Sequence, residues 1–241
     1  MKFEKHSGHG LYLLSSFTWG KAYDDQAEIC CAGPPPNSWD VPSEMGLADF
    51  NQTLHWVLSY DYLLPFGSGQ KYAAGVNTVV NQIIGGWHFG GIYSLGSGFP
   101  FSPSAGYDSS NTGTNGSVRP DQILADANLP RGKRSISLWF NPDAYQDPQV
   151  RAAYAFGNAG RNTLIGPDTN NFDLSLRKTF AIRETKNVEF RFEAFNALNH
   201  PSFAQPDNDI QDTPAGPDGV GGITSTAGAN RDLQLALKFN F

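Results

Sequence analysis

The side chains of this 241-residue chain that could bind a metal ion lie in two small groups. His6 and His9 have a spacing compatible with metal ligation, but no cluster of further ligands accompanies them. Asp207, Asp209 and Asp212 resemble a loose calcium loop whose pattern then fails, because the glycine that an EF-hand loop needs is missing. We therefore expect no bound metal and no cofactor, and we interpret the aspartates as part of a solvated outer loop.

A pair of carboxylates, Glu189 and Glu193, flanks Arg191 on one face of a predicted strand. Two carboxylates can act as acid and base, but charges that pair along a strand are the better interpretation. The chain has no phosphate-binding glycine loop and no G-x-S-x-G nucleophile motif. We expect that it is not an enzyme.

Aromatic side chains are frequent in the long segment 100–169, namely Tyr107, Trp139, Phe140, Tyr145 and Tyr154. Such rings could stack on a sugar or on another flat ligand. Packing within the loop is the alternative, and we prefer it because long loops also need internal contacts.

Composition restricts the class of protein. The formal net charge is −6, which argues against a nucleic-acid partner. The 26 Gly and 16 Pro interrupt the chain too often for a helical bundle, and 13% aromatic residues argue against disorder. Cys30 and Cys31 are adjacent and fit neither a disulfide framework nor a zinc site, so their role stays open.

Alternation of apolar and polar residues is the strongest pattern in the sequence, and it predicts an all-β, antiparallel fold. The six predicted strands cover residues 11–19, 54–62, 87–95, 172–180, 187–196 and 233–241. Each has roughly the 9–11 residues that a tilted membrane-spanning strand needs. No run of 18 apolar residues predicts a transmembrane helix.

The connections between these strands alternate in length. Long loops cover about 20–50, 100–169 and 197–231, whereas 181–186 forms a tight hairpin and the connection before residue 87 includes a short helical turn near 76–84. We expect residues 1–9 to be disordered, with no signal peptide, and residues 10–241 to form part of an up-and-down barrel. Long outer loops and short periplasmic turns are typical of outer-membrane barrels.

The two faces of the predicted strands differ in chemistry. Charges on one face suit a watery lumen and aromatic residues near strand ends suit a membrane interface, whereas Lys178 interrupts the apolar face. The predicted lipid-facing residues are Leu54, Trp56, Leu58, Phe190, Phe192, Leu235 and Leu237. The predicted lumen-facing residues are Asp173, Arg177, Glu189, Arg191, Glu193 and Lys238. A soluble β-sandwich that binds carbohydrate is the alternative, because its strands alternate too.

Several stretches add a family resemblance. They are LSYDYLLPFG at 58–67, GGWHFGGIYS at 85–94 with SGFPF at 97–101, FGNAGRN at 156–162, NFDLSL at 171–176, FRFEAFN at 190–196 and LALKFNF at 235–241. In order and spacing the chain resembles the C-terminal barrel portion of Oar-like TonB-dependent outer-membrane receptors. These receptors are common in acidobacteria and often carry a carboxypeptidase-regulatory-like domain at the N-terminus.

The resemblance implies a location in the outer membrane and a nutrient-uptake function. It also implies a barrel of about 22 strands closed around a plug domain. Phe239 and Phe241 match the C-terminal signal that the barrel-assembly machinery reads, and the TonB complex would act only through a missing N-terminal part. Because a plug, a TonB box and further strands are missing, we expect the chain to be a fragment, with lipid and the remaining strands as its partners.

Overall fold

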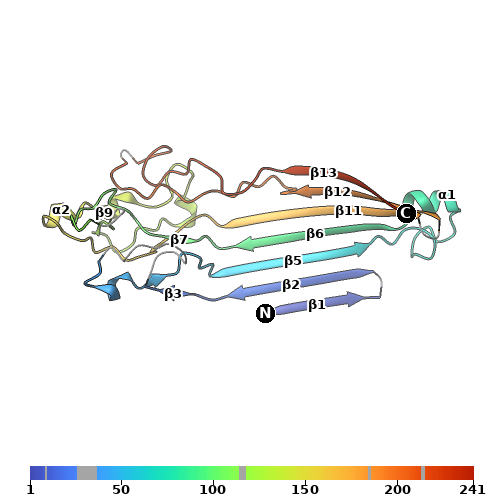
Figure 1. Cartoon of the computed structure of the whole chain (residues 1–241), viewed down its shortest axis with the longest axis horizontal. Helices are drawn as coiled ribbons and strands as arrows, with labels where there is room; N and C mark the ends of the chain where they lie inside the picture. The colour runs from blue at the N-terminus through green and yellow to red at the C-terminus, as the bar shows by residue number, and fades with distance from the viewer. Residues whose placement is uncertain (9, 26–36, 114–117, 184–185, 213–214) are drawn as a thin grey trace.

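A single antiparallel sheet of seven strands dominates the computed structural model, which describes residues 1–8, 10–25, 37–113, 118–183, 186–212 and 215–241 (Figure 1). In spatial order the strands are β1 (Lys2–Ser7), β2 (Leu11–Trp19), β5 (Leu54–Leu63), β6 (Trp87–Gly96), β11 (Thr169–Arg183), β12 (Lys186–Phe195) and β13 (Asp232–Asn240). All six predicted strands are confirmed, and every neighbouring pair is antiparallel. His9, Cys30 and Cys31 lie outside the described residues.

The prediction of a disordered segment over residues 1–9 was wrong for most of its length. Residues Lys2–Ser7 form β1, which pairs with β2 from Lys2 opposite Ser16 to Ser7 opposite Leu11. Only Phe3 among these six residues is strongly apolar, so the alternating pattern does not mark the strand. The conformation of β1 is determined by hydrogen bonding to β2 rather than by burial of an apolar face.

The three long connections fold together at one end of the sheet (Figure 1). We call the described residues of 20–53, 97–168 and 197–231 the loop module. It contains the short strand pairs β3 (Tyr23–Asp24) with β4 (Gly46–Leu47), β7 (Pro100–Phe101) with β10 (Leu164–Ile165), and β8 (Asp121–Gln122) with β9 (Tyr145–Gln146). Its helical turns are η1 (Val41–Glu44), η2 (Arg131–Lys133), η3 (Pro142–Ala144) and α2 (Pro148–Arg151).

The hydrophobic core of the chain lies in the loop module. Phe140 is buried and meets Phe101 and Tyr145 edge to face, with ring centroids 5.9 and 6.3 Å apart. Leu164 and Val220 belong to the same cluster, so the second and third long loops meet there. These loops are therefore folded structure with a core of their own.

The opposite end of the sheet carries the shorter connections. Helix α1 (Thr78–Ile84) confirms the helical turn predicted near 76–84. It begins where the Asn77 side chain accepts a hydrogen bond from the Val80 backbone N–H, 2.9 Å away, which is a standard N-cap. It ends at Gly85, just before β6.

The sheet forms one layer. Among the described residues of its seven strands, Ala194 is the only hydrophobic side chain in the buried set, and no second sheet packs on the apolar face. The β-sandwich alternative requires such a second layer, and the described residues do not supply it. The helices within the described ranges are also not long and apolar enough to cross a membrane.

Candidate functional site

The strand register sorts the predicted facing residues correctly into two sets. Arg177 lies opposite Arg191, and Glu189 lies opposite Lys238, so these side chains share one face of the sheet. Side chains alternate between the two faces along a strand, so Asp173, four residues before Arg177, and Glu193, two residues after Arg191, lie on this same face. The seven residues predicted to face lipid all lie on the other face, for example Phe190 opposite Leu237. Which medium each face meets stays a prediction.

The charged face is organised around Asp61 of β5. The Arg177 Nη2 atom of β11 lies 2.5 Å from the Asp61 carboxylate, and the His88 Nδ1 atom of β6 lies 3.4 Å from the same oxygen. The sequence analysis missed Asp61 and His88 as site residues, although both fall on the polar side of alternating segments. The Asp61 and Arg177 side chains are about a third to a half exposed, so water weakens the attraction within this ion pair.

Gly90 makes the contact between Asp61 and Arg177 possible. It lies on β6 between the two strands, opposite both Asp61 and Ser175. A Cβ atom at Gly90 would lie 2.8 Å from the Ser175 hydroxyl oxygen and would fill the space above the strand. The missing side chain thus opens a path from β5 to β11 across β6.

This open path is the floor of a hollow of about 410 Å³. Its lining includes Tyr12 from β2 as well as Asp61, and Asp173, Arg177, Arg191 and Glu193 from β11 and β12. Both signs of charge are present within this small area. The hollow can therefore bind a polar or zwitterionic surface by charge and hydrogen bonding, but it holds no arrangement of a nucleophile with a base.

The carboxylate pair singled out in the sequence is part of this charged face. Glu189 forms an ion pair with Arg191 two residues along β12, while Glu193 lines the hollow. The predicted pairing of charges along the strand is confirmed for Glu189 and Arg191.

Within the described ranges, no group of three or more His, Cys, Asp or Glu side chains could hold a metal ion. Instead, Asp207 and Asp209 form turns of their own loop, since the Asp207 carboxylate accepts a hydrogen bond from the Asp209 N–H, 3.0 Å away. The pKa of Asp212 is raised, chiefly by a hydrogen bond with Asp207 and by the negative charge of Asp207, and to a smaller extent by desolvation and by the charge of Asp209. His6 pairs with Glu4, 3.0 Å away.

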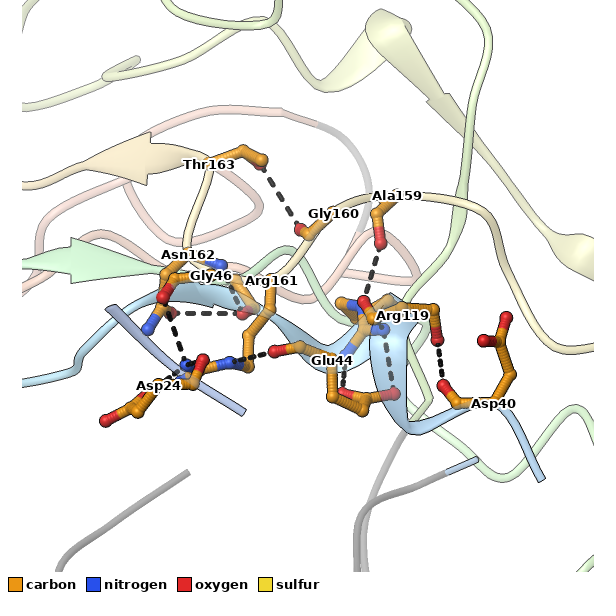
Figure 2. Close-up of polar contacts among 12 residues, drawn as sticks. Asp24, Asp40, Glu44, Gly46, Arg119, Ala159, Gly160, Arg161, Asn162 and Thr163 are labelled. Atoms are coloured by element: carbon orange, nitrogen blue, oxygen red, sulfur yellow. Dashed lines mark hydrogen bonds and ion pairs between the residues drawn. The ribbon is translucent and has the colours of Figure 1, made fainter. Parts of the chain in front are cut away.

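Arg161 connects two of the long loops through a buried guanidinium group (Figure 2). Its Nε atom donates to the Glu44 carbonyl oxygen at 2.7 Å, and its Nη2 atom donates to the Asp24 carbonyl oxygen at 2.6 Å. It also forms ion pairs with the Asp24 and Asp49 carboxylates. One arginine therefore fixes the first long loop against the second.

A second arginine contacts the same part of the first loop. Arg119 binds the Glu44 carboxylate with both Nη atoms, at 2.5 and 2.9 Å, and donates from Nε to the Ala159 carbonyl oxygen at 2.8 Å (Figure 2). Glu44 is almost completely buried. Gly157 lies so close that a Cβ atom there would be 1.9 Å from the Arg119 carbonyl oxygen.

A third arginine of the loop module, Arg151, forms an ion pair with Asp121. The Arg151 Nε and Nη2 atoms lie 2.8 and 3.1 Å from the two carboxylate oxygens of buried Asp121. Sequence reasoning missed all of these loop pairs. The one sequence signal for these ion pairs was the stretch 156–162, which contains Gly157 and Arg161 and is among the stretches that carry the family resemblance.

The loop aromatics behave mostly as predicted for internal packing. Phe140 and Tyr145 are buried in the core, and the Trp139 indole N–H donates to the Ile165 carbonyl oxygen at 2.8 Å. The Tyr107 hydroxyl donates to the Asp147 carboxylate at 2.7 Å, and burial together with that hydrogen bond raises the pKa of Tyr107 to about 12. Tyr154 alone of the five is well exposed.

The predicted assembly signal lies at the free edge of the sheet. Phe239 is on the apolar face of β13, and Phe241 follows the strand; both rings are exposed and their centroids are 6.0 Å apart. Nothing in the geometry tests recognition by an assembly machinery, so that role stays a prediction.

Comparison with known proteins gives one match. The model of a family described as an outer membrane beta barrel domain matches residues 1–234. Searches of curated proteins and of solved structures find no match.

Proposed function

This chain belongs to the outer membrane β-barrel domain family, and from that premise we propose that it forms part of the barrel wall of a TonB-dependent receptor for nutrient uptake. In this proposal the chain performs no covalent chemistry. Its apolar face contacts lipid, its charged face borders the lumen, and its loop module captures the nutrient outside the cell.

The single-layer sheet is the observation that carries this proposal. A soluble sheet with one apolar face covers that face with a second layer, because exposed apolar area costs about 25 cal/mol per Å². Here no second layer of strands covers the apolar face of β5, β6, β11 and β12 within the described part of the chain, where α1 covers the end of that face beside Lys178. Strands β5, β6 and β12 have 10 residues each, which suits a tilted crossing of the hydrocarbon layer.

The two ends of the sheet support an orientation. The folded loop module lies at one end, and the shorter connections with α1 lie at the other (Figure 1). In outer-membrane barrels the longer loops are extracellular and the shorter turns periplasmic. The loop module is thus the part of this chain that we expect to meet ligands from outside.

The edges of the sheet require further strands. Six antiparallel pairings separate β1 from β13, so these two edge strands run in the same direction. Closing the barrel with antiparallel neighbours on both sides therefore needs an odd number of additional strands. Lipid cannot hydrogen-bond the open edges, so we propose that those strands, a plug and the assembly machinery are partners of this chain.

Sequence resemblance and the charged face support a receptor rather than a passive channel. The stretches at 58–67, 156–162 and 190–196 resemble TonB-dependent receptors of the Oar type. The hollow around Asp61 presents both signs of charge, which suits contact with a polar plug surface. The TonB complex itself would act through the plug and not through these residues.

A pair of neighbouring substitutions tests the lipid-facing assignment. Phe192→Arg puts a charge on the apolar face, whereas Arg191→Gln removes one from the charged face of the same strand. Phe192 lies opposite Leu176 and Leu235, two residues further from α1 than the Lys178–Phe190 pair. Near the bilayer midplane an Arg costs about 2–4 kcal/mol, so Phe192→Arg should strongly reduce the amount of folded protein in outer-membrane fractions, and Arg191→Gln should have little effect. Equal losses, or extraction of the native protein without detergent, would contradict the proposal.

Uptake measurements test the receptor assignment separately. Uptake of the nutrient should stop when the inner-membrane TonB complex is deleted, and it should continue if the protein is a passive pore. The second result would remove the receptor function and leave the barrel assignment intact.

A further inference from the structure

A buried lysine stands on the apolar face of β11. Lys178 lies opposite Trp87 of β6 and Phe190 of β12, both on the predicted lipid side, and it is only 2% exposed. An isolated charge facing hydrocarbon is unfavourable unless it is paired or hydrogen-bonded. The salt bridges found among the described residues do not include one to Lys178, so its charge is compensated in another way.

The carboxyl end of helix α1 provides that compensation. The Lys178 ammonium donates hydrogen bonds to the carbonyl oxygens of Ile83, at 3.1 Å, and of Gly85. These carbonyls form the negative end of the helix, where a cation is stabilised. The ammonium also lies 5.2 Å from the ring centroid of Trp87 and 5.0 Å from that of Phe180, within the range of cation–π attraction.

These contacts hold α1 over the apolar face of the sheet. The Trp87 indole N–H donates to the same Ile83 carbonyl oxygen at 2.9 Å. The Gln82 amide donates to the Ala181 carbonyl oxygen of β11 at 3.4 Å. The helix is therefore attached to β6 and β11 on the side that we assign to lipid.

The outward side of α1 is apolar and uncovered. Val79 and Ile83, one helical turn apart, are 71% and 65% exposed, and Val80 is exposed beside them. The whole connection 64–86 contains one lysine and no aspartate or glutamate. Phe66 and Tyr72 form an exposed ring pair in the same connection.

We propose that residues 64–86 form a membrane-interface anchor in which α1 lies at the boundary between headgroups and acyl chains of the leaflet on the short-turn side. This inference rests on the proposed function, because it needs the apolar face to meet lipid. The exposed side of α1 continues that face, and a segment without negative charge suits a phospholipid surface. Lys178 is the clamp: its ammonium group binds the helix end and is thereby shielded from the hydrocarbon.

The location of α1 is tested by fluorescent labels in outer-membrane preparations that carry the full chain. Single labels are attached to Val79→Cys, Val150→Cys and Leu176→Cys in a background with Cys30→Ser and Cys31→Ser. Leu176 of β11 lies on the apolar face of the sheet, opposite Phe192. Val150 in α2 is the matched control, because it is 72% exposed on a short helix at the loop end. A nitroxide-labelled stearic acid added to the membranes should quench the Val79 and Leu176 labels and leave the Val150 label bright.

The labels distinguish failure of the anchor from failure of the barrel assignment. If the Leu176 label is quenched but the Val79 label behaves like the Val150 label, the anchor proposal is wrong and the barrel assignment stands. If the Leu176 label is not quenched either, the proposed function itself is wrong.

Replacing the lysine tests the clamp. Lys178→Met retains an unbranched apolar stem but cannot donate to the two carbonyls. With this substitution the Val79 label should lose most of its quenching, while the Leu176 label keeps it and so shows that the sheet still assembles. Unchanged quenching at Val79 would overturn the clamp.

Discussion

Replacement of one largely buried arginine, Arg119, should destabilise the loop module without affecting the sheet. Arg119→Gln removes the cation that binds both oxygens of Glu44. The Glu44 side chain is 3% exposed and that of Arg119 is 12% exposed, so the remaining carboxylate would be buried without its ion-pair partner. The first and second long loops would lose one of their connections.

The expected magnitude follows from this burial. Breaking a buried ion pair by removing one partner costs about 3–5 kcal/mol. Because Arg119 keeps some contact with water, we expect the lower end, about 3 kcal/mol. Since about 1.4 kcal/mol corresponds to a factor of ten, local opening should become roughly a hundredfold more frequent.

Hydrogen exchange measures this opening on the detergent-solubilised protein. The reporting amides are Met45, bonded to the Pro42 carbonyl oxygen at 3.2 Å, and Ala159, bonded to the Pro120 carbonyl oxygen at 3.0 Å. Both should exchange faster in Arg119→Gln, whereas amides in β11 should not change.

An exposed ion pair provides the control. Arg131 lies 3.0 Å from Asp168, with side chains 86% and 48% exposed, so Arg131→Gln should cost no more than about 1 kcal/mol. Equal acceleration by the two Arg→Gln changes would refute the argument from burial, as would acceleration in Arg119→Gln that spreads evenly over the sheet.

Three further predictions concern the same module. Phe140→Ala should cost about 3–5 kcal/mol because the ring is buried, and thermal unfolding of the loop module should occur at lower temperature. Asp212→Asn should stabilise the module near neutral pH, because the pKa of Asp212 is raised in the folded protein and the ionised carboxylate therefore destabilises it as pH rises through that pKa. In denaturant titrations the native protein and the variant should reach the same stability at acidic pH, where the native carboxyl is protonated. Absorbance titration should show Tyr107 ionising at about pH 12. The contribution of the neutral Tyr107 hydroxyl to the stability of the fold should then be complete below pH 10 and be lost between pH 10 and pH 12, and Asp147→Asn should lower the pKa of Tyr107.

The strands of the sheet could largely be predicted from the sequence, because alternation with period two is a local pattern. The exception is β1, where Lys2 and Lys5 fall on opposite faces and hide any alternation. Lys178, which breaks the apolar face of β11, could be noticed but not explained, since its partners are backbone carbonyls 93 and 95 residues earlier.

The polar site of the loop module could not be predicted. Arg161 and Asp24 are 137 residues apart in the chain, and neither lies in a periodic segment. A buried ion pair leaves no signature in composition, since Arg119 in the module and Arg131 on its surface look alike in the sequence. On the charged face of the sheet, the side of each strand was predictable, whereas the contact of Asp61 with Arg177 depended on the gap at Gly90.

The arginine contacts of the loop module also determine at which stage of folding the module can form. Arg161 binds Asp24 across 137 residues, Arg119 binds Glu44 across 75 residues, and β5 and β6 lie between the members of both pairs. Closing such large loops in an unstructured chain is entropically expensive, but pairing of the intervening strands shortens the effective distance. We therefore expect the guanidinium contacts to form late in folding. Once formed they also fix strand alignment, because sliding β5 or β6 by two residues would displace the strand by about 7 Å and separate Arg119 from Glu44.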